Sequence, residues 1–77
     1  MTETHAELDA TGLKCPMPVL RARRAMKPLK AGEVLLLRAD DPASAKDVPA
    51  FCEMSGFELV ETREAGDVLE FLIRKSE

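Results

Sequence analysis

The sequence predicts an α+β fold, a two-layer α/β sandwich in which two helices cover one face of a four-stranded mixed sheet. Three observations lead to this prediction. Apolar residues recur at helical spacing in the first third of the chain, a continuous apolar run occupies residues 33–39, and two strand-like segments near the end are separated by a turn signal. In chain order the elements read βαβαββ, and two helices on one face bury this pattern most simply. We expect residues 1–77 to form a single domain.

A short strand and a helix are expected in the first third of the chain. Residues 5–10 alternate weakly between apolar and polar, and "TGLK" then turns the chain. The helical repeat that follows consists of Val19, Ala22, Met26 and Leu29. Pro28 and Gly32 indicate that this helix ends near Lys27.

Because of the two prolines, the sequence allows two starting points for this helix. It begins at Pro16 or only at Pro18, because a residue before proline avoids the α region, which suits Cys15 as an N-cap but argues against a helical Met17. Each proline restricts one φ angle, so the loop that presents Cys15 is stiff. The prolines also lack N–H groups, which leaves Met17 and Val19 as the nearest backbone donors for an anion.

A buried strand and a second helix are expected in the middle of the chain. The apolar run over residues 33–39 is typical of an interior strand covered on one or both faces. Pro49 argues against a long second helix. We therefore expect a loose turn over residues 42–47 and a helix over residues 48–55, with Gly56 capping its C-terminus.

A β-hairpin is expected at the end of the chain. Residues 57–64 and 68–75 read as strands joined at "AGD". Alternation in the last strand places Leu69, Phe71 and Ile73 on one face, and Glu70, Leu72 and Arg74 on the other.

Composition narrows the classes of function. The net charge is −3, yet the segment from Lys14 to Lys30 contains six basic residues and no acidic one. Aromatic residues make up only 4% of the chain, whereas single-stranded nucleic-acid surfaces usually need stacking rings. One histidine and two cysteines cannot assemble the usual four zinc ligands, so we expect no metal and no cofactor.

Cys15 is the candidate reactive residue. It directly precedes the first predicted helix, where unpaired N–H groups and the positive end of the helix dipole favour an anion. At such positions a thiol pKa can fall from about 8.5 into roughly the 3.5–7.5 range, and the adjacent Lys14 adds positive potential. We therefore expect an activated thiolate. The alternative is a small apolar residue at a turn.

The residues around Cys15 in the sequence indicate that its thiol carries a transferred group, rather than acting in acyl transfer or in a C-x-x-C redox motif. No histidine or asparagine lies nearby for an acyl-transfer pair, and no second cysteine lies three residues on. A rigidly held thiolate without a base suits a sulfane sulfur held as a persulfide and passed on by thiol–persulfide exchange. Such a protein is a sulfurtransferase-type carrier, whether or not it counts as an enzyme.

The exposed side of the first helix is a candidate docking surface. Outside its inward-facing arc lie two apolar side chains, Met17 and Leu20. They are framed by Arg21, Arg23, Arg24 and Lys27. Apolar residues framed by cations beside a thiol suit an acidic partner. The alternative is a solvated basic face with scattered apolar residues.

The second cysteine, Cys52, shares a face of the second predicted helix with Val48 and Phe51. This position indicates packing in the core. A relay or resolving thiol is the alternative, but a disulfide with Cys15 needs the two Cα atoms within about 7 Å, whereas one lies at a helix start and the other in mid-helix.

The motifs resemble the TusA-like sulfur carriers (the TusA/SirA family) from about Leu8 to Lys75. The resemblance is carried by "LDATGLKCPMPVLRARR", which contains the C-P-x-P motif of the family, and by "GEVLLLRADDPAS" and "DVPAFCEMSGFELVE". The segment "DVPAFC" is similar in particular to the branch that serves tRNA thiolation.

The resemblance implies a βαβαββ sandwich whose C-P-x-P cysteine accepts persulfide sulfur from a cysteine desulfurase. In the namesake branch the sulfur passes to a downstream relay protein and finally to the tRNA wobble uridine as 2-thiouridine. Related members serve sulfur oxidation or molybdenum-cofactor assembly, so the acceptor stays open.

The resemblance also assigns roles to residues. Cys15 carries the sulfur, and Pro16 and Pro18 form the scaffold of the motif. The residues expected to contact the desulfurase are Arg23, Asp41 and Met54. Family sequences vary at Met17, at Leu20 and over residues 22–24, which include Arg24, so the choice of partner stays open at this part of the surface.

A function from another class is a small nucleic-acid or regulatory binding module that uses the basic helix. The net acidity and the scarcity of aromatics weigh against it, and we expect no tight nucleic-acid binding. No apolar run approaches the roughly 20 residues of a membrane span, and the first ten residues do not read as a signal peptide. We therefore expect a cytoplasmic monomer that pairs transiently with its partners.

Overall fold

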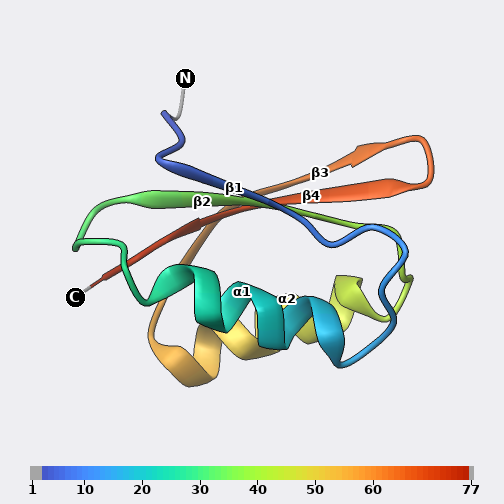
Figure 1. Cartoon of the computed structure of the whole chain (residues 1–77), viewed down its shortest axis with the longest axis horizontal. Coiled ribbons are helices and arrows are strands. Elements are labelled where there is room, and N and C mark those ends of the chain that lie inside the picture. Colours follow the sequence, from blue (N-terminus) through green and yellow to red (C-terminus); the bar gives the residue numbers. More distant parts are fainter. Residues whose placement is uncertain (1–2, 77) are drawn as a thin grey trace.

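The computed structural model describes residues 3–76, in which two helices pack side by side on one face of a four-stranded sheet (Figure 1). In chain order the elements are β1 (Ala6–Asp9), α1 (Met17–Met26), β2 (Val34–Ala39), α2 (Ser44–Ser55), β3 (Glu58–Ala65) and β4 (Val68–Arg74). This order is the predicted βαβαββ.

The sheet is mixed, with the spatial order β1-β2-β4-β3. β1 pairs with β2 in parallel, while β4 lies antiparallel to both β2 and β3. Helices α1 and α2 are the two crossovers, and both pass over the same face of the sheet. The two-layer α/β sandwich predicted from the sequence is therefore confirmed.

The core lies between the helices and this face of the sheet. Its fully buried large side chains come from α1, α2, β2 and β4: Met26, Leu35, Leu37, Val48, Phe71 and Ile73. The predicted inward arc of α1 is confirmed, since Ala22 and Met26 are buried and Val19 and Leu29 pack against the core, as Ala25 also does. Burial of these faces holds α1 and α2 in place beside each other.

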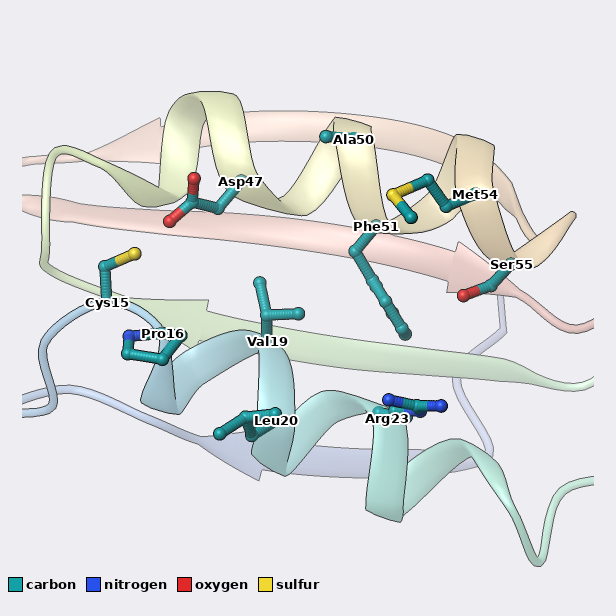
Figure 2. Close-up of a pocket in the computed structure, with 10 residues that line it drawn as sticks. All are labelled: Cys15, Pro16, Val19, Leu20, Arg23, Asp47, Ala50, Phe51, Met54 and Ser55. Carbon is teal, nitrogen blue, oxygen red and sulfur yellow. The ribbon is translucent and has the colours of Figure 1, made fainter.

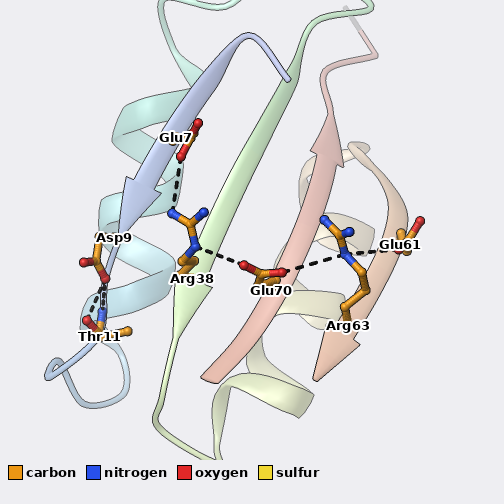
Figure 3. A network of polar contacts seen from close by, with 7 residues as sticks. All are labelled: Glu7, Asp9, Thr11, Arg38, Glu61, Arg63 and Glu70. Carbon is orange, nitrogen blue, oxygen red and sulfur yellow. Dashed lines mark hydrogen bonds and ion pairs between the residues drawn. The ribbon is translucent and has the colours of Figure 1, made fainter. Parts of the chain in front are cut away.

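No helix covers the opposite face of the sheet in residues 3–76, and the side chains of the strands pack against one another there. Val34, Leu36 and Leu72 form a small second cluster there. Next to it a ladder of ion pairs runs across all four strands: Glu7, Arg38, Glu70, Arg63 and Glu61 (Figure 3). The central Arg38 Nε–Glu70 Oε2 pair is 3.0 Å long. Opposite charges on neighbouring strands favour this register over a shifted one.

Helix α1 differs from the prediction at its start. It begins at Met17, so Met17 is helical although Pro18 follows it, and Pro16 rather than Cys15 is the N-cap residue. The expectation about Met17 was wrong because the preference before proline is a bias, which the burial of Pro18 against the core outweighs.

Helix α2 is longer than predicted. It begins at Ser44 rather than near Val48, and Pro49 lies inside it. An interior proline removes one hydrogen bond of the helix and costs about 3 kcal/mol in isolation. Here the buried face formed by Ser44, Val48, Phe51 and Cys52 stabilises the helix on both sides of the proline.

The ends of the remaining elements follow the sequence closely. Gly56 ends α2 in the left-handed conformation, with φ +79°, and its N–H donates to the carbonyl of Cys52. Gly66 turns the chain between β3 and β4 at φ +64°, within the predicted "AGD" turn.

Candidate functional site

A groove of about 440 Å³ lies between α1 and α2, with Cys15 at one end (Figure 2). Each helix lines it with one stripe. The stripe of α1 and its cap is Pro16, Val19, Leu20 and Arg23, and the stripe of α2 is Asp47, Ala50, Phe51 and Met54. Both sets have the spacing i, i+3, i+4, i+7, which places four residues on one side of a helix. The groove therefore follows directly from the packing of the two helices.

The walls of the groove are largely apolar and partly open to solvent. Leu20 is 47% exposed and Met54 89% exposed, while Phe51 closes the floor at 8%. Figure 2 shows Arg23 on α1 at the opposite end of the groove from Cys15. An exposed apolar surface beside a thiol and a cation is suited to binding another protein.

The backbone at Cys15 is held by the loop before α2. The Cys15 N–H donates to Asp41 Oδ2 over 2.6 Å, and Asp41 Oδ1 accepts from the Ala43 N–H over 3.2 Å. These two hydrogen bonds, together with the nearby charge of Lys14, hold the pKa of the Asp41 carboxyl below its usual range. Asp41 thus ties the reactive loop to the start of α2.

The Cys15 side chain is exposed and faces Asp47 across the end of the groove (Figure 2). A hydrogen bond to the Asp47 carboxylate, some desolvation, and the charges of Asp47 and Asp41 raise the pKa of the Cys15 thiol. This direction is opposite to the lowered pKa that the sequence predicted. The prediction was wrong because it counted only charges close in sequence, whereas the charges that act on the thiol in the folded chain are the carboxylates of Asp47 and Asp41.

One of the two expected backbone donors, the Met17 N–H, is used differently. The Met17 N–H donates to the Lys14 carbonyl over 2.8 Å, so it does not point at an anion on Cys15. The positive charge of Lys14 acts on Asp41. A role for Lys14 in activating the thiol stays a prediction.

The groove brings together part of the predicted docking surface. Leu20, Arg23 and Met54 line it with Cys15. Met17, which is 38% exposed, and Arg24 lie on the exposed surface of α1 outside the groove. Asp41 lies behind the reactive loop, where it bonds to the Cys15 backbone.

Sequence reasoning missed Asp47, Ala50 and Phe51 as site residues. Their spacing with Met54 is a second helical stripe, and this signal is present in the sequence. It was hidden because Pro49 led to a turn being expected over residues 42–47. With the helix starting at Ser44, Asp47 falls on the same side of α2 as the groove.

Cys52 is buried in the core at 2% exposure, as predicted from its position on α2. Burial raises the pKa of its thiol to about 11, because the thiolate would lose its hydration. Both cysteines are free thiols. Cys52 therefore packs the core, and the groove presents only Cys15.

Comparison with known proteins identifies the family. A family model described as sulfurtransferase TusA matches residues 6–75. The sulfur carrier protein TusA of Allochromatium vinosum is 46% identical over 76 residues, which cover 99% of this chain and 100% of that protein. The chain belongs to the TusA family of sulfur carrier proteins.

The fold of this TusA-family protein is similar to a solved one. The crystal structure of a SirA-like protein from Desulfitobacterium hafniense superposes with a TM-score of 0.82 at 31% identity, and the match covers 95% of this chain and 100% of the other. The resemblance read from the C-P-x-P motif is thereby confirmed. A role as a sulfur carrier, acting with sulfur-relay partners, follows from the family.

Two further observations concern other kinds of site. Within residues 3–76, neither helix has the length and apolar character that a membrane crossing requires. The same part of the chain contains no group of three or more histidine, cysteine, aspartate or glutamate side chains placed to share a metal ion.

Proposed function

We propose that Cys15 is the residue of this TusA-family protein that carries the sulfur, as a persulfide received from a cysteine desulfurase. The observation that carries the proposal is the contrast between the two thiols. Cys15 is exposed at the end of an apolar groove, whereas Cys52 is 2% exposed in the core. A sulfur atom passed between proteins must be reachable by both of them.

The transfer is an exchange between a thiol and a persulfide. The Cys15 Sγ, as thiolate, attacks the outer sulfur of a donor cysteine persulfide, R–S–SH. A new S–S bond forms on Cys15, and the bond between the two donor sulfurs breaks with its electron pair staying on the donor as R–S⁻. The proton lost by Cys15 is balanced by the proton that the donor thiolate takes up, and no net oxidation occurs.

The groove supplies the surface on which a donor or an acceptor would bind. Leu20 and Met54 offer apolar contact, and Arg23 offers a positive charge at the far end. An apolar centre with a charged rim is the usual composition of a protein interface. We propose that Leu20, Arg23 and Met54 contact the partners, with Met17 and Arg24 at the edge of the contact.

We further propose that the acceptor chain leads to 2-thiouridine at the tRNA wobble position. The support is the similarity of "DVPAFC" to the branch of the family that serves tRNA thiolation. In the structure this segment forms part of the groove wall through Asp47, Ala50 and Phe51. Sulfur oxidation and molybdenum-cofactor assembly would use the same Cys15 chemistry with other partners.

Mass spectrometry tests the first proposal. The protein is incubated with a cysteine desulfurase and cysteine, and its intact mass is measured without reductant. We expect one added sulfur that a reductant removes, that Cys15→Ser abolishes and that Cys52→Ala leaves in place. An added sulfur on the Cys15→Ser variant would overturn the proposal.

The proposed acceptor is tested in the cell. 2-Thiouridine is measured in tRNA from the host with and without its gene for this protein. We expect the modification to be lost with the gene, restored by the wild type and not restored by Cys15→Ser. Unchanged 2-thiouridine after loss of the gene would exclude tRNA thiolation and leave the carrier role intact.

A further inference from the structure

Asp47 is the charged group that faces the Cys15 sulfur in the groove (Figure 2). We propose that the Asp47 carboxylate holds Cys15 in its protonated thiol form in the free protein, and so restrains its reaction with sulfur donors. The effect on sulfur uptake rests on the proposed function, whereas the effect on the thiol itself does not.

The position of Asp47 supports this role. It lies on the groove side of α2, half-buried, with its carboxylate directed toward the end of the groove where Cys15 lies. Among residues 3–76 no lysine or arginine forms an ion pair with it. Its negative charge is therefore not neutralised by an ion pair within the described part of the chain, and it faces the thiol across the end of the groove.

The other charged groups around Cys15 have a smaller part in this role, and the charge of Asp41 is the smallest of the causes that raise the pKa of the thiol. From the reactive loop, Lys14 acts on Asp41. From the loop before α2, Asp41 uses both oxygens on backbone N–H groups, and from α1, Arg23 lies at the far end of the groove. The raised pKa of Cys15 has Asp47 as its largest cause, which agrees with this geometry.

The chemistry of transfer explains what such a carboxylate does. Cys15 attacks a persulfide as the thiolate, so its S–H proton must first pass to water, and the departing donor thiolate takes up a proton afterwards. While Asp47 is ionised, its negative charge faces the sulfur across the end of the groove, so a thiolate on Cys15 would meet a like charge there. A lysine or arginine of a bound partner placed against Asp47 would remove this opposition. The thiol would then ionise mainly in the complex.

The test is the pH dependence of alkylation on the full-length protein. The rate at which iodoacetamide modifies Cys15 is followed by peptide mass spectrometry for the wild type and for Asp47→Asn, Asp47→Glu and Glu53→Gln. Asparagine keeps the shape of the side chain and a hydrogen-bond acceptor but removes the charge. Glu53 is exposed on the same helix outside the groove, so Glu53→Gln is a matched control for loss of charge.

We expect the midpoint of the rate profile to move to lower pH in Asp47→Asn, and to stay near the wild-type value in Asp47→Glu and Glu53→Gln. For each pH unit of that shift the alkylation rate at neutral pH should rise roughly three- to fourfold rather than tenfold, because nucleophilicity falls as basicity falls. Circular dichroism of each variant shows whether the fold is kept.

An unchanged midpoint in folded Asp47→Asn would overturn the inference, and so would an equal shift in Glu53→Gln. If Asp47→Asn does not fold, Asp47→Ser replaces it under the same criteria. The desulfurase assay separates the two proposals. A lowered midpoint in a protein that never takes up sulfur supports the role of Asp47 and contradicts the proposed function.

Discussion

The two cysteines of this protein have the same thiol side chain but lie in very different surroundings. Cys15 is exposed at the end of the groove, on a loop held by Asp41. Cys52 is 2% exposed on the buried side of α2. Both thiols have a raised pKa, but carboxylates raise that of Cys15 and burial raises that of Cys52.

This difference in cause decides what each thiol can do. A partner can pair with a carboxylate and so remove its effect on Cys15, whereas burial can be removed only by opening the core. The ionisation of Cys15 is therefore opposed by carboxylates, but a partner can still reach its thiol. Cys52, in contrast, is part of the core packing. Four predictions test this contrast, from the largest expected effect to the smallest.

Alkylation should separate the two thiols most strongly. At a pKa of about 11, roughly one Cys52 in ten thousand is ionised at neutral pH, and the core must open before a reagent reaches it. We expect iodoacetamide to modify Cys15 at least ~100-fold faster than Cys52. Site-resolved mass spectrometry measures both rates in one sample. Similar rates would mean that α2 leaves the sheet readily.

Replacing a cysteine with serine should lower the stability of the protein at Cys52 but not at Cys15. Cys52→Ser places a hydroxyl in an apolar site, which should lower the free energy of unfolding by ~1–3 kcal/mol. Cys15→Ser changes an exposed side chain and should stay within ~0.5 kcal/mol of the wild type. Urea unfolding measures both. A comparable loss in Cys15→Ser would show that Cys15 also supports the fold.

High pH should destabilise the protein through Cys52. Its pKa is about 11 in the folded state and near 9 when unfolded, so the folded state holds the proton more tightly. The resulting stability is present below about pH 9 and is lost as the pH rises toward 11. Urea midpoints at about pH 8 and pH 10.5 should therefore fall more in the wild type than in Cys52→Ala. Parallel falls would contradict this origin.

Substituting a charged residue that lines the groove should weaken partner binding, and this effect should be the smallest of the four. Arg23 lines the groove, while Arg21 lies exposed on the same helix outside it. We expect Arg23→Ala to raise the protein concentration needed for half-maximal sulfur uptake from a desulfurase about three- to tenfold, as for a charge at the rim of an interface. Arg21→Ala is the control, and an equal effect would point to general charge attraction.

Much of the fold could be predicted because local patterns record which faces are buried. The repeat from Val19 to Leu29 marked the inner side of α1, and Leu69, Phe71 and Ile73 marked the inner face of β4. The errors lie where a local preference competes with packing. The proline rules placed Met17 outside α1 and shortened α2, but burial of the helix faces outweighed both.

For the candidate site, the sequence by itself determined the reactive loop: a cysteine followed by two prolines directly before a helix, with a family motif around it. These features depend on neighbours along the chain. Only the tertiary structure decided what the sulfur faces, since Asp41 and Asp47 reach Cys15 from the loop before α2 and from α2 itself. Electrostatic interactions act through space. The charge environment of the thiol therefore became visible only once the two helices were packed side by side.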